Sequence, residues 1–235
     1  MLFDVQLLRG SALREYFPVA DGLTPDGRHY QPADAESWHV LLEDERGRVR
    51  GCARYRPITA GFSQLGARDC ALAKSKTFGH LLEREVENHI RRARAANLQY
   101  GEAGGWVLAP EIRGSTAAIN IALMTFALAD QLGGGMGLTT ATTRHYSAAM
   151  LRRLGGDRLG GLPAYYDPKY GCIIEILAFD MKALAPQFAP KLEFFKSILS
   201  TMPIICGPRS TQPVPAVTGF PLAQRPAAKA SALLN

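Results

Sequence analysis

The chain of 235 residues has no apolar run long enough to cross a membrane. Its longest apolar stretch, residues 117–132, contains Asn120, Thr125 and Asp130, so it predicts a buried helix and not a membrane span. The N-terminus carries Asp4 and lacks the basic segment of a secretory signal peptide. We therefore expect a cytoplasmic protein without stable membrane insertion.

Cysteine and histidine are scarce, and neither shows the spacing of a metal site. The sequence has four cysteines and no C-x-x-C pair, which is typical of reduced cytosolic thiols and not of a disulfide framework. Among the five histidines, the spacing of His80 and His89 does not place them on one face of a helix. We therefore expect no bound metal.

The excess of positive charge is modest. Lysine and arginine number 27 against 21 aspartates and glutamates, which gives a net charge of +6. This excess suits an acidic partner such as nucleic acid, an anionic membrane surface or an acidic carrier protein. The basic residues are not interleaved with aromatic residues in one stripe, so we expect no nucleic-acid binding. A hydrophobic content of 47% excludes disorder of the whole chain.

The apolar pattern predicts one α/β domain with a mixed central sheet. The first two strands read as a hairpin, and later strands alternate with helices, so the sheet should begin antiparallel and continue through helical connections. After Gly207 the chain is rich in proline, alanine and serine, so we expect a domain over residues 1–206 and a flexible tail over 207–235. The expected helices are residues 7–17, 78–97, 115–132 and 147–154, and the expected strands are 38–43, 49–56, 101–108, 136–143 and 171–179.

The turn between the strand at 101–108 and the next helix carries the clearest chemical signal. Arg113, Gly114, Ser115 and Thr116 stand immediately before the apolar helix. The unpaired N–H groups and positive dipole of a helix start suit a phosphate, and glycine lets the backbone approach it closely. Ser115 and Thr116 are also ordinary helix-capping residues, so this pattern alone leaves both interpretations open.

The order of elements resembles the GNAT acyltransferase fold. In that family the loop before the buried helix carries an Arg/Gln-x-x-Gly-x-Gly/Ala pattern that holds the pantetheine pyrophosphate. The run from Arg113 to Ala118 keeps the leading arginine and the final alanine but has Thr116 at the central glycine. The resemblance implies that a thioester carrier binds along the strand and this loop, through Trp106, Val107, Arg113, Gly114, Ser115 and Thr116.

Within that fold, residues 14–180 resemble the acyl-homoserine-lactone (autoinducer) synthases of quorum sensing and the related long-chain N-acyl amino acid synthases. The matching segments are Leu13-Arg-Glu-Tyr-Phe17, Asp34, Gly51-Cys-Ala-Arg54, Glu102-Ala-Gly-Gly-Trp-Val107 and residues 150–160. The resemblance implies that Arg14, Phe17, Asp34 and Arg54 line the amine substrate. The chain departs from the family at Gln31, where an acid is expected, and at Gly104–Gly105, which replace Ser-Arg. Because both departures fall around the amine pocket, the acceptor amine stays open.

Glu102 is the candidate catalytic residue. An amine attacks a thioester only as the free base, and a buried carboxylate on the central strand can take its proton, directly or through a water. The alternative is a strand glutamate in solvent. A bulge at Gly104–Gly105 would free N–H donors for the oxyanion. The family's reaction needs no covalent enzyme intermediate, so no cysteine is required as a nucleophile.

Three functional hypotheses follow. The first is an acyl-homoserine-lactone-type synthase that uses acyl-carrier protein or acyl-CoA as the donor and S-adenosylmethionine as the acceptor, with no resident cofactor. The second is an N-acyl amino acid synthase, and the third is a non-catalytic protein that binds carrier protein or nucleic acid. Arg144, Arg152 and Arg153 are candidates for docking a carrier protein, although a solvated helix face explains each of them equally well.

Overall fold

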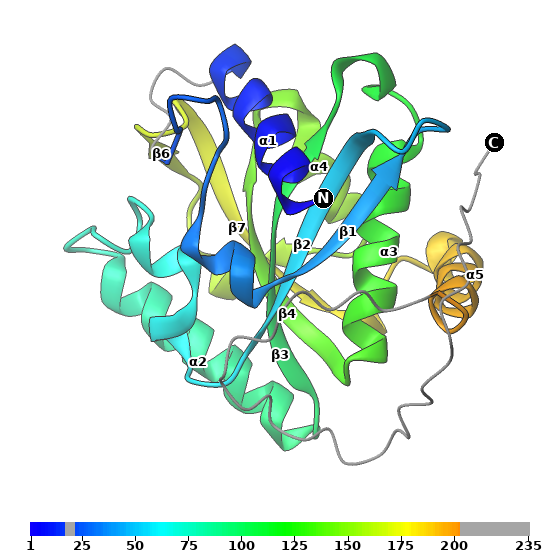
Figure 1. Cartoon of the computed structure of the whole chain (residues 1–235). Coiled ribbons are helices and arrows are strands. Elements are labelled where there is room, and N and C mark those ends of the chain that lie inside the picture. Colours follow the sequence, from blue (N-terminus) through cyan, green and yellow to red (C-terminus); the bar gives the residue numbers. More distant parts are fainter. Residues whose placement is uncertain (17–21, 203–235) are drawn as a thin grey trace.

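A computed structural model describes residues 1–16 and 22–202, which form a seven-stranded sheet covered by helices (Figure 1). The expected tail at 207–235 and the predicted site residue Phe17 lie outside these residues. The helices are α1 (Leu2–Tyr16), α2 (Gly79–Ala95), α3 (Ala117–Gln131), α4 (Ser147–Arg153) and α5 (Ala189–Leu199). The strands are β1 (Trp38–Glu43), β2 (Val49–Ile58), β3 (Gln99–Leu108), β4 (Gly134–Thr142), β5 (Asp157–Arg158), β6 (Tyr165–Asp167) and β7 (Cys172–Asp180).

The sheet is mixed, as the sequence predicts. Its order is β1-β2-β3-β4-β7-β5, and β6 also pairs with β7. β3 and β4 are parallel, and the other neighbouring strands are antiparallel. The β1–β2 turn is closed by Asp44, whose Oδ1 accepts hydrogen bonds from the N–H groups of Arg46 and Arg48, both at 3.0 Å. Gly47 takes the positive φ of 71° that this turn requires.

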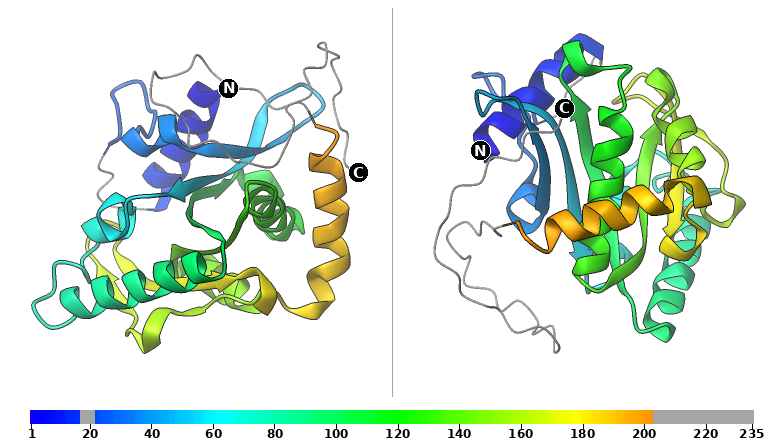
Figure 2. Two further views of the ribbon diagram at one scale, coloured as in Figure 1. Left: turned by 90° about the horizontal axis from the view of Figure 1, so that it is seen from below. Right: turned by 90° about the vertical axis from the view of Figure 1, so that its right-hand side faces the viewer.

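The two layers of helices are distinguished by what they bury. α2 packs on one side of the sheet, where Leu82, Val86 and Ile90 meet Tyr100 and Leu138. α3, α4 and α5 pack on the other side, and Figure 2 shows α3 and α5 stacked there, away from α1 and α2. α3 is apolar almost all round because it lies between the sheet and α5. Among residues 1–16 and 22–202, none of the helices has the length and apolar character needed to cross a bilayer.

Several sequence predictions need correction. The first helix begins at Leu2 and not at residue 7. The short strands β5 and β6 and the helix α5 were not predicted. α5 does carry a signal, because Pro190 stands in its first turn and the buried residues Leu192 and Phe195 are three apart. The other predicted elements agree with the structure to within two residues.

Candidate functional site

The parallel strands β3 and β4 separate after a short ladder. Their last paired residues are Glu102 and Leu138, although β3 continues to Leu108 and β4 to Thr142. Beyond that pair, β3 stays hydrogen-bonded to β2 and β4 stays hydrogen-bonded to β7. The edge of each strand that faces the gap therefore offers backbone N–H and C=O groups to a ligand.

A bulge in β3 lies beside this gap. Cys52 pairs with Val107 and Arg54 pairs with Gly104, so β3 has one residue more than β2 between these two pairs. Gly105 has a φ of 60°, and a Cβ atom there would lie 3.2 Å from Nη1 of Arg9. The predicted bulge is confirmed, and glycine is needed because an L-residue rarely adopts this backbone conformation.

A buried ion pair joins α1 to the turn before β1. Arg9 Nη1 donates to Asp34 Oδ1 at 2.7 Å, and its Nη2 bonds the other carboxylate oxygen, so the pair is bidentate. Both residues are only 2% exposed. Burial alone would raise the pKa of Asp34, but the hydrogen bonds and charge of Arg9 and the charge of Arg54 outweigh it and lower this pKa. Asp34 is therefore a fixed anion that orients arginines.

Arg9 is the arginine of α1 that joins this ion-pair cluster, whereas the predicted Arg14 is exposed. The structure places Arg14 on the surface, with its guanidinium against Gly27. Sequence reasoning missed Arg9, although a signal exists. Arg9 stands on the same face of the helix as the buried residues Val5 and Leu13, where an arginine needs a buried partner.

Arg54 connects this ion pair to the bulge. Its Nη1 donates to Gln31 Oε1 at 2.5 Å and to Asp34 Oδ1 at 3.2 Å. Its Nε and Nη2 lie beside Gly104 and make no hydrogen bond within the part of the chain that the structure describes. Burial lowers the pKa of Arg54, yet the guanidinium stays charged at neutral pH. The structure thus brings Asp34 and Arg54 together, as predicted, and leaves two donor atoms of Arg54 without a hydrogen bond to the described residues.

Glu102 is buried at the point where the two parallel strands part. It is 7% exposed, so the alternative of a solvent-exposed strand glutamate is wrong. Oε2 accepts hydrogen bonds from Arg56 Nη2 at 3.0 Å and from the N–H of Gly66 at 3.1 Å. Oε1 accepts one from the N–H of Ala67 at 3.3 Å. These donors fix the carboxylate and leave Oε1 with room for a further partner.

In the loop between β3 and α3, the four residues predicted to bind the thioester carrier each have a different environment. Arg113 is engaged by Glu15, with Nη1 to Oε1 at 3.0 Å, and also by Tyr16 and the carbonyl of Leu108. Gly114 has a φ of 76° and open space around it. The hydroxyl of Ser115 accepts a hydrogen bond from the N–H of Ala117 at 3.2 Å, within the turn that precedes α3. Thr116 makes no side-chain cap.

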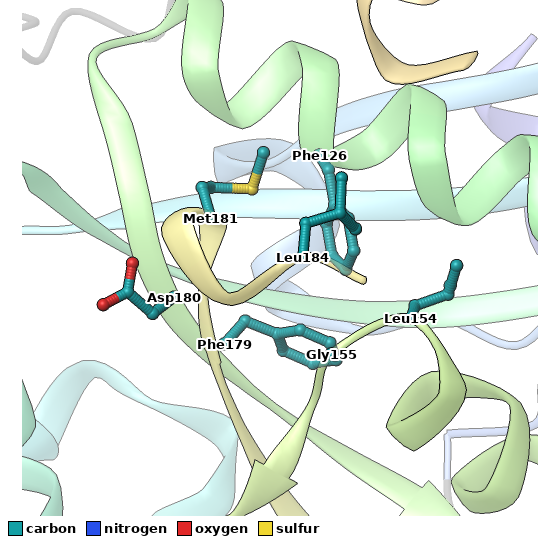
Figure 3. Close-up of a pocket in the computed structure, with 7 residues that line it drawn as sticks. All are labelled: Phe126, Leu154, Gly155, Phe179, Asp180, Met181 and Leu184. Atoms are coloured by element: carbon teal, nitrogen blue, oxygen red, sulfur yellow. The ribbon is translucent and has the colours of Figure 1, made fainter. Parts of the chain in front are cut away.

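The side of the sheet that carries α3 is apolar at the gap. A small hollow of about 30 Å³, partly open to solvent, lies between α3 and strands β2, β3, β4 and β7. Phe126 and Phe179 line it, and their ring centroids are 5.0 Å apart (Figure 3).

Trp106 follows the bulge and packs into this apolar layer, whereas Val107 stays paired with Cys52. Trp106 Nε1 and Asn120 Oδ1 are buried and have no hydrogen-bond partner among the described residues.

The three arginines proposed for carrier docking do not form one patch of free charge. Arg144 donates to the carbonyls of Tyr16 and Gly171, at 2.5 and 2.8 Å, and so joins α1 to the strand end. Arg152 lies 3.6 Å from Glu175, and Arg153 stacks on the ring of Phe188. Within residues 1–16 and 22–202, no group of three or more His, Cys, Asp or Glu side chains is arranged to hold a metal ion.

Comparison with solved structures identifies this arrangement of elements. The CoA-dependent acyl-homoserine lactone synthase BjaI superposes with a TM-score of 0.52 at 19% identity, over 89% of this chain and 87% of that one. The chain has the fold of the acyl-homoserine lactone synthases. The predicted GNAT-like α/β fold is thereby confirmed.

Two further synthases match in the same way. MesI, also CoA-dependent, gives a TM-score of 0.52 at 17% identity, over 83% of this chain and 86% of that one. LasI gives a TM-score of 0.50 at 19% identity, over 77% of this chain and 82% of that one. No protein-family model matches the sequence, and no curated protein matches it.

Proposed function

We propose that the protein is an N-acyltransferase that moves a fatty acyl group from a thioester to an amine. The observation that carries the proposal is the gap after Glu102 and Leu138, because a buried carboxylate, unpaired strand edges and an apolar hollow meet there. The shared fold supports it, since BjaI and MesI are CoA-dependent acyl-homoserine lactone synthases.

The thioester is proposed to lie in the gap with its carbonyl oxygen toward the bulge. N–H groups freed by the bulge at Gly105 would then donate to the oxyanion of the tetrahedral intermediate. Trp106 Nε1 and Asn120 Oδ1 supply one unused donor and one unused acceptor, which suit the amides of a pantetheine arm. The acyl chain would continue along the apolar α3 side of the sheet.

Glu102 is proposed to take the proton of the amine. The amine nitrogen attacks the carbonyl carbon, a C–N bond forms, and the C–S bond breaks so that the thiolate leaves on the carrier. The proton lost by the amine passes to Oε1 of Glu102, directly or through a water. Arg56 and the N–H groups of Gly66 and Ala67 hold the carboxylate in place for this transfer.

The arrangement of the arginines favours an acceptor that carries a carboxylate. Three arginines, Arg9, Arg54 and Arg56, face two buried carboxylates, Asp34 and Glu102, and Arg56 also pairs with the exposed Glu36 at 3.6 Å, so the ion pairs of the cluster are balanced in charge. The open donors of Arg54 suit a carboxylate oxygen. S-adenosylmethionine carries an amine and a carboxylate, and a BjaI structure holds it together with isopentyl-CoA. We therefore propose S-adenosylmethionine as the first acceptor, in the manner of the lactone synthases.

A free amino acid is the second candidate acceptor. S-adenosylmethionine brings an additional sulfonium charge into a site whose ion pairs already balance. At Gln31 the chain has an amide where the family has an acid, and this amide accepts a hydrogen bond from Arg54. That observation favours an acceptor without a second cation. The donor is an acyl-CoA or an acyl-carrier protein, and Arg152 and Arg153 on α4 are the arginines proposed for docking the latter.

The test is mass spectrometry of organic extracts from cells that express the protein, with cells expressing Glu102→Gln as the control. N-acyl-homoserine lactones that disappear in the control would support the first acceptor, and N-acyl amino acids that disappear would support the second. Removal of a positioned general base should lower turnover by about 10²- to 10⁴-fold. Extracts without any N-acyl product, from cells that contain the folded protein, would contradict the proposal.

A further inference from the structure

The segment between β2 and α2 folds over the carboxylate of Glu102. It contains two short 3₁₀ helices, η2 (Phe62–Gln64) and η3 (Gly66–Asp69). The N–H groups of Gly66 and Ala67, at the start of η3, donate hydrogen bonds to this carboxylate at 3.1 and 3.3 Å. The position of the proposed base therefore depends on where this segment lies.

A glutamate of α2 holds the start of the segment. Oε1 of Glu87, a partly buried residue, accepts a hydrogen bond from the N–H of Phe62 at 2.7 Å, a length typical of a charged acceptor. Gly61 has a φ of 90°, and a Cβ atom there would lie 2.7 Å from the same oxygen. Glycine at position 61 therefore lets the carboxylate of Glu87 come close enough to bind the backbone of the segment.

A second contact from α2 is longer and lies further along the chain from Glu102's donors. Nη2 of Arg94 donates to the carbonyl of Thr59 at 3.1 Å, and the side chain of Arg94 is exposed. Glu87, in contrast, binds directly at η2, next to the donors of η3. Glu87 is therefore the residue of α2 with the more direct hold on the segment.

The connection between η2 and η3 has little freedom. Leu65, which lies between them, is 1% exposed and belongs to the apolar core beneath α2. Nη2 of Arg56 donates both to the carbonyl of Gln64 and to Oε2 of Glu102, the latter at 3.0 Å. Because closely packed groups transmit a displacement and do not absorb it, a shift at the start of η2 reaches the donors of Glu102.

We infer that Glu87 is a positioning residue for Glu102. It holds η2, and through η2 the N–H donors of η3, so that the carboxylate stays where the proton of the amine must be taken. This inference rests on the proposed function. Glu87 touches no reacting atom in that arrangement and acts only through the segment between β2 and α2. Its loss should therefore lower kcat and leave the KM values of both substrates nearly unchanged.

The experiment measures kcat and KM of the full chain with acyl-CoA thioesters as donors and with S-adenosylmethionine or free amino acids as acceptors. Glu87→Ala removes the hydrogen-bond acceptor and should lower kcat by about tenfold, with each KM changed by less than about twofold. Glu87→Gln keeps an oxygen that can accept the same hydrogen bond, so its kcat should lie within about threefold of that of the unmodified protein. Glu83→Ala, at an exposed glutamate of the same helix, is the matched control and should leave kcat unchanged.

Gly61→Ala reaches the same contact from the other side, so it tests the inference even if Glu87→Ala does not fold. Its Cβ atom would push Oε1 of Glu87 away from the N–H of Phe62, and kcat should fall in the same way. A combined variant separates positioning from a general loss of structure. If Glu87 acts through the carboxylate of Glu102, adding Glu87→Ala to Glu102→Gln should lower the residual rate no further.

Two outcomes would overturn the inference and leave the proposed function standing. The first is a folded Glu87→Ala protein with the same kcat as Glu83→Ala. The second is a further fall in rate when Glu87→Ala is added to Glu102→Gln, because α2 would then affect turnover by another route. If the unmodified protein forms no N-acyl product from any thioester, the proposed function fails, and this inference fails with it.

Discussion

The two sides of the β3–β4 gap differ in what determines the position of their side chains. On the side of α1, Arg9, Asp34, Arg54 and Glu102 are held by ion pairs and hydrogen bonds with defined geometry. On the side of α3, small residues and aromatic rings pack closely and leave only about 30 Å³ of apolar space. The same strands serve both sides because alternate residues of a strand point to opposite faces. The comparison teaches that directed bonds position the groups proposed to react, whereas the other side of the sheet is shaped by apolar packing alone.

On the polar side, we expect the largest loss of stability when the ion pair between Arg9 and Asp34 is broken. Asp34→Ala leaves Arg9 buried without its carboxylate, so we expect the free energy of unfolding to fall by about 3–5 kcal/mol. Arg14→Ala, on the exposed face of the same helix, should change it by less than about 0.5 kcal/mol. Chemical denaturation measures both values. Equal losses in the two variants would show that the polar side is not held by this pair.

The pH dependence of stability tests the same side with a smaller expected effect. Burial and then the charge of Arg9 lower the pKa of His29 to about 4, whereas an unfolded histidine has a pKa of about 6.5. Between these values the unfolded chain binds a proton that the folded chain does not, so stability falls as the pH drops from 6.5 toward 4. His29→Asn should lose about 2–3 kcal/mol less than the unmodified protein over this range. Denaturation curves of both proteins at pH 7 and pH 4.5 measure this difference. An equal loss of stability in His29→Asn and in the unmodified protein would contradict a neutral, buried His29.

Alanine substitutions at the two glycines of the bulge should have the smallest effect on stability. They distinguish the cost of a strained backbone from the cost of an added side-chain atom. Gly105 has a positive φ and Gly104 does not, although both lie beside Arg54. Gly105→Ala should cost about 1–2 kcal/mol because an L-residue is strained in this conformation. Gly104→Ala should change stability by less than about 0.5 kcal/mol. Thermal denaturation compares the two, and a larger loss at Gly104 would contradict the assignment of the bulge.

The fold was predictable because its long elements have clear periodicity and turn residues. The hairpin around Gly47 and the apolar helix before Leu132 are examples. The short strands β5 and β6 were not predictable, because two or three residues give no period and pair only when β7 is already in place. The start of α1 was also missed, since its exposed residues Leu2 and Phe3 do not mark a buried face.

The candidate site was predictable in part. Glu102, Asp34 and Arg54 were found through their family resemblance, and the structure brings Asp34 and Arg54 into one ion-pair cluster. Arg9 was not found, because its partner lies 25 residues away and the contact depends on how α1 docks. The ion pair of Arg113 with Glu15, 98 residues away in the sequence, likewise depends on the tertiary structure and was not predicted. Charge patterns locate arginines, but they do not say which acid each one meets.

The central claim is that the polar side of the gap binds the amine through Arg54 and deprotonates it through Glu102. One measurement tests it directly: product analysis by mass spectrometry at graded acceptor concentrations, for Arg54→Gln and Glu102→Gln. The account predicts that Arg54→Gln raises the KM for the acceptor by about tenfold or more. It predicts that Glu102→Gln lowers kcat by about 10²- to 10⁴-fold and changes that KM less than Arg54→Gln does. An unchanged KM in Arg54→Gln, or full turnover in Glu102→Gln, would contradict the account.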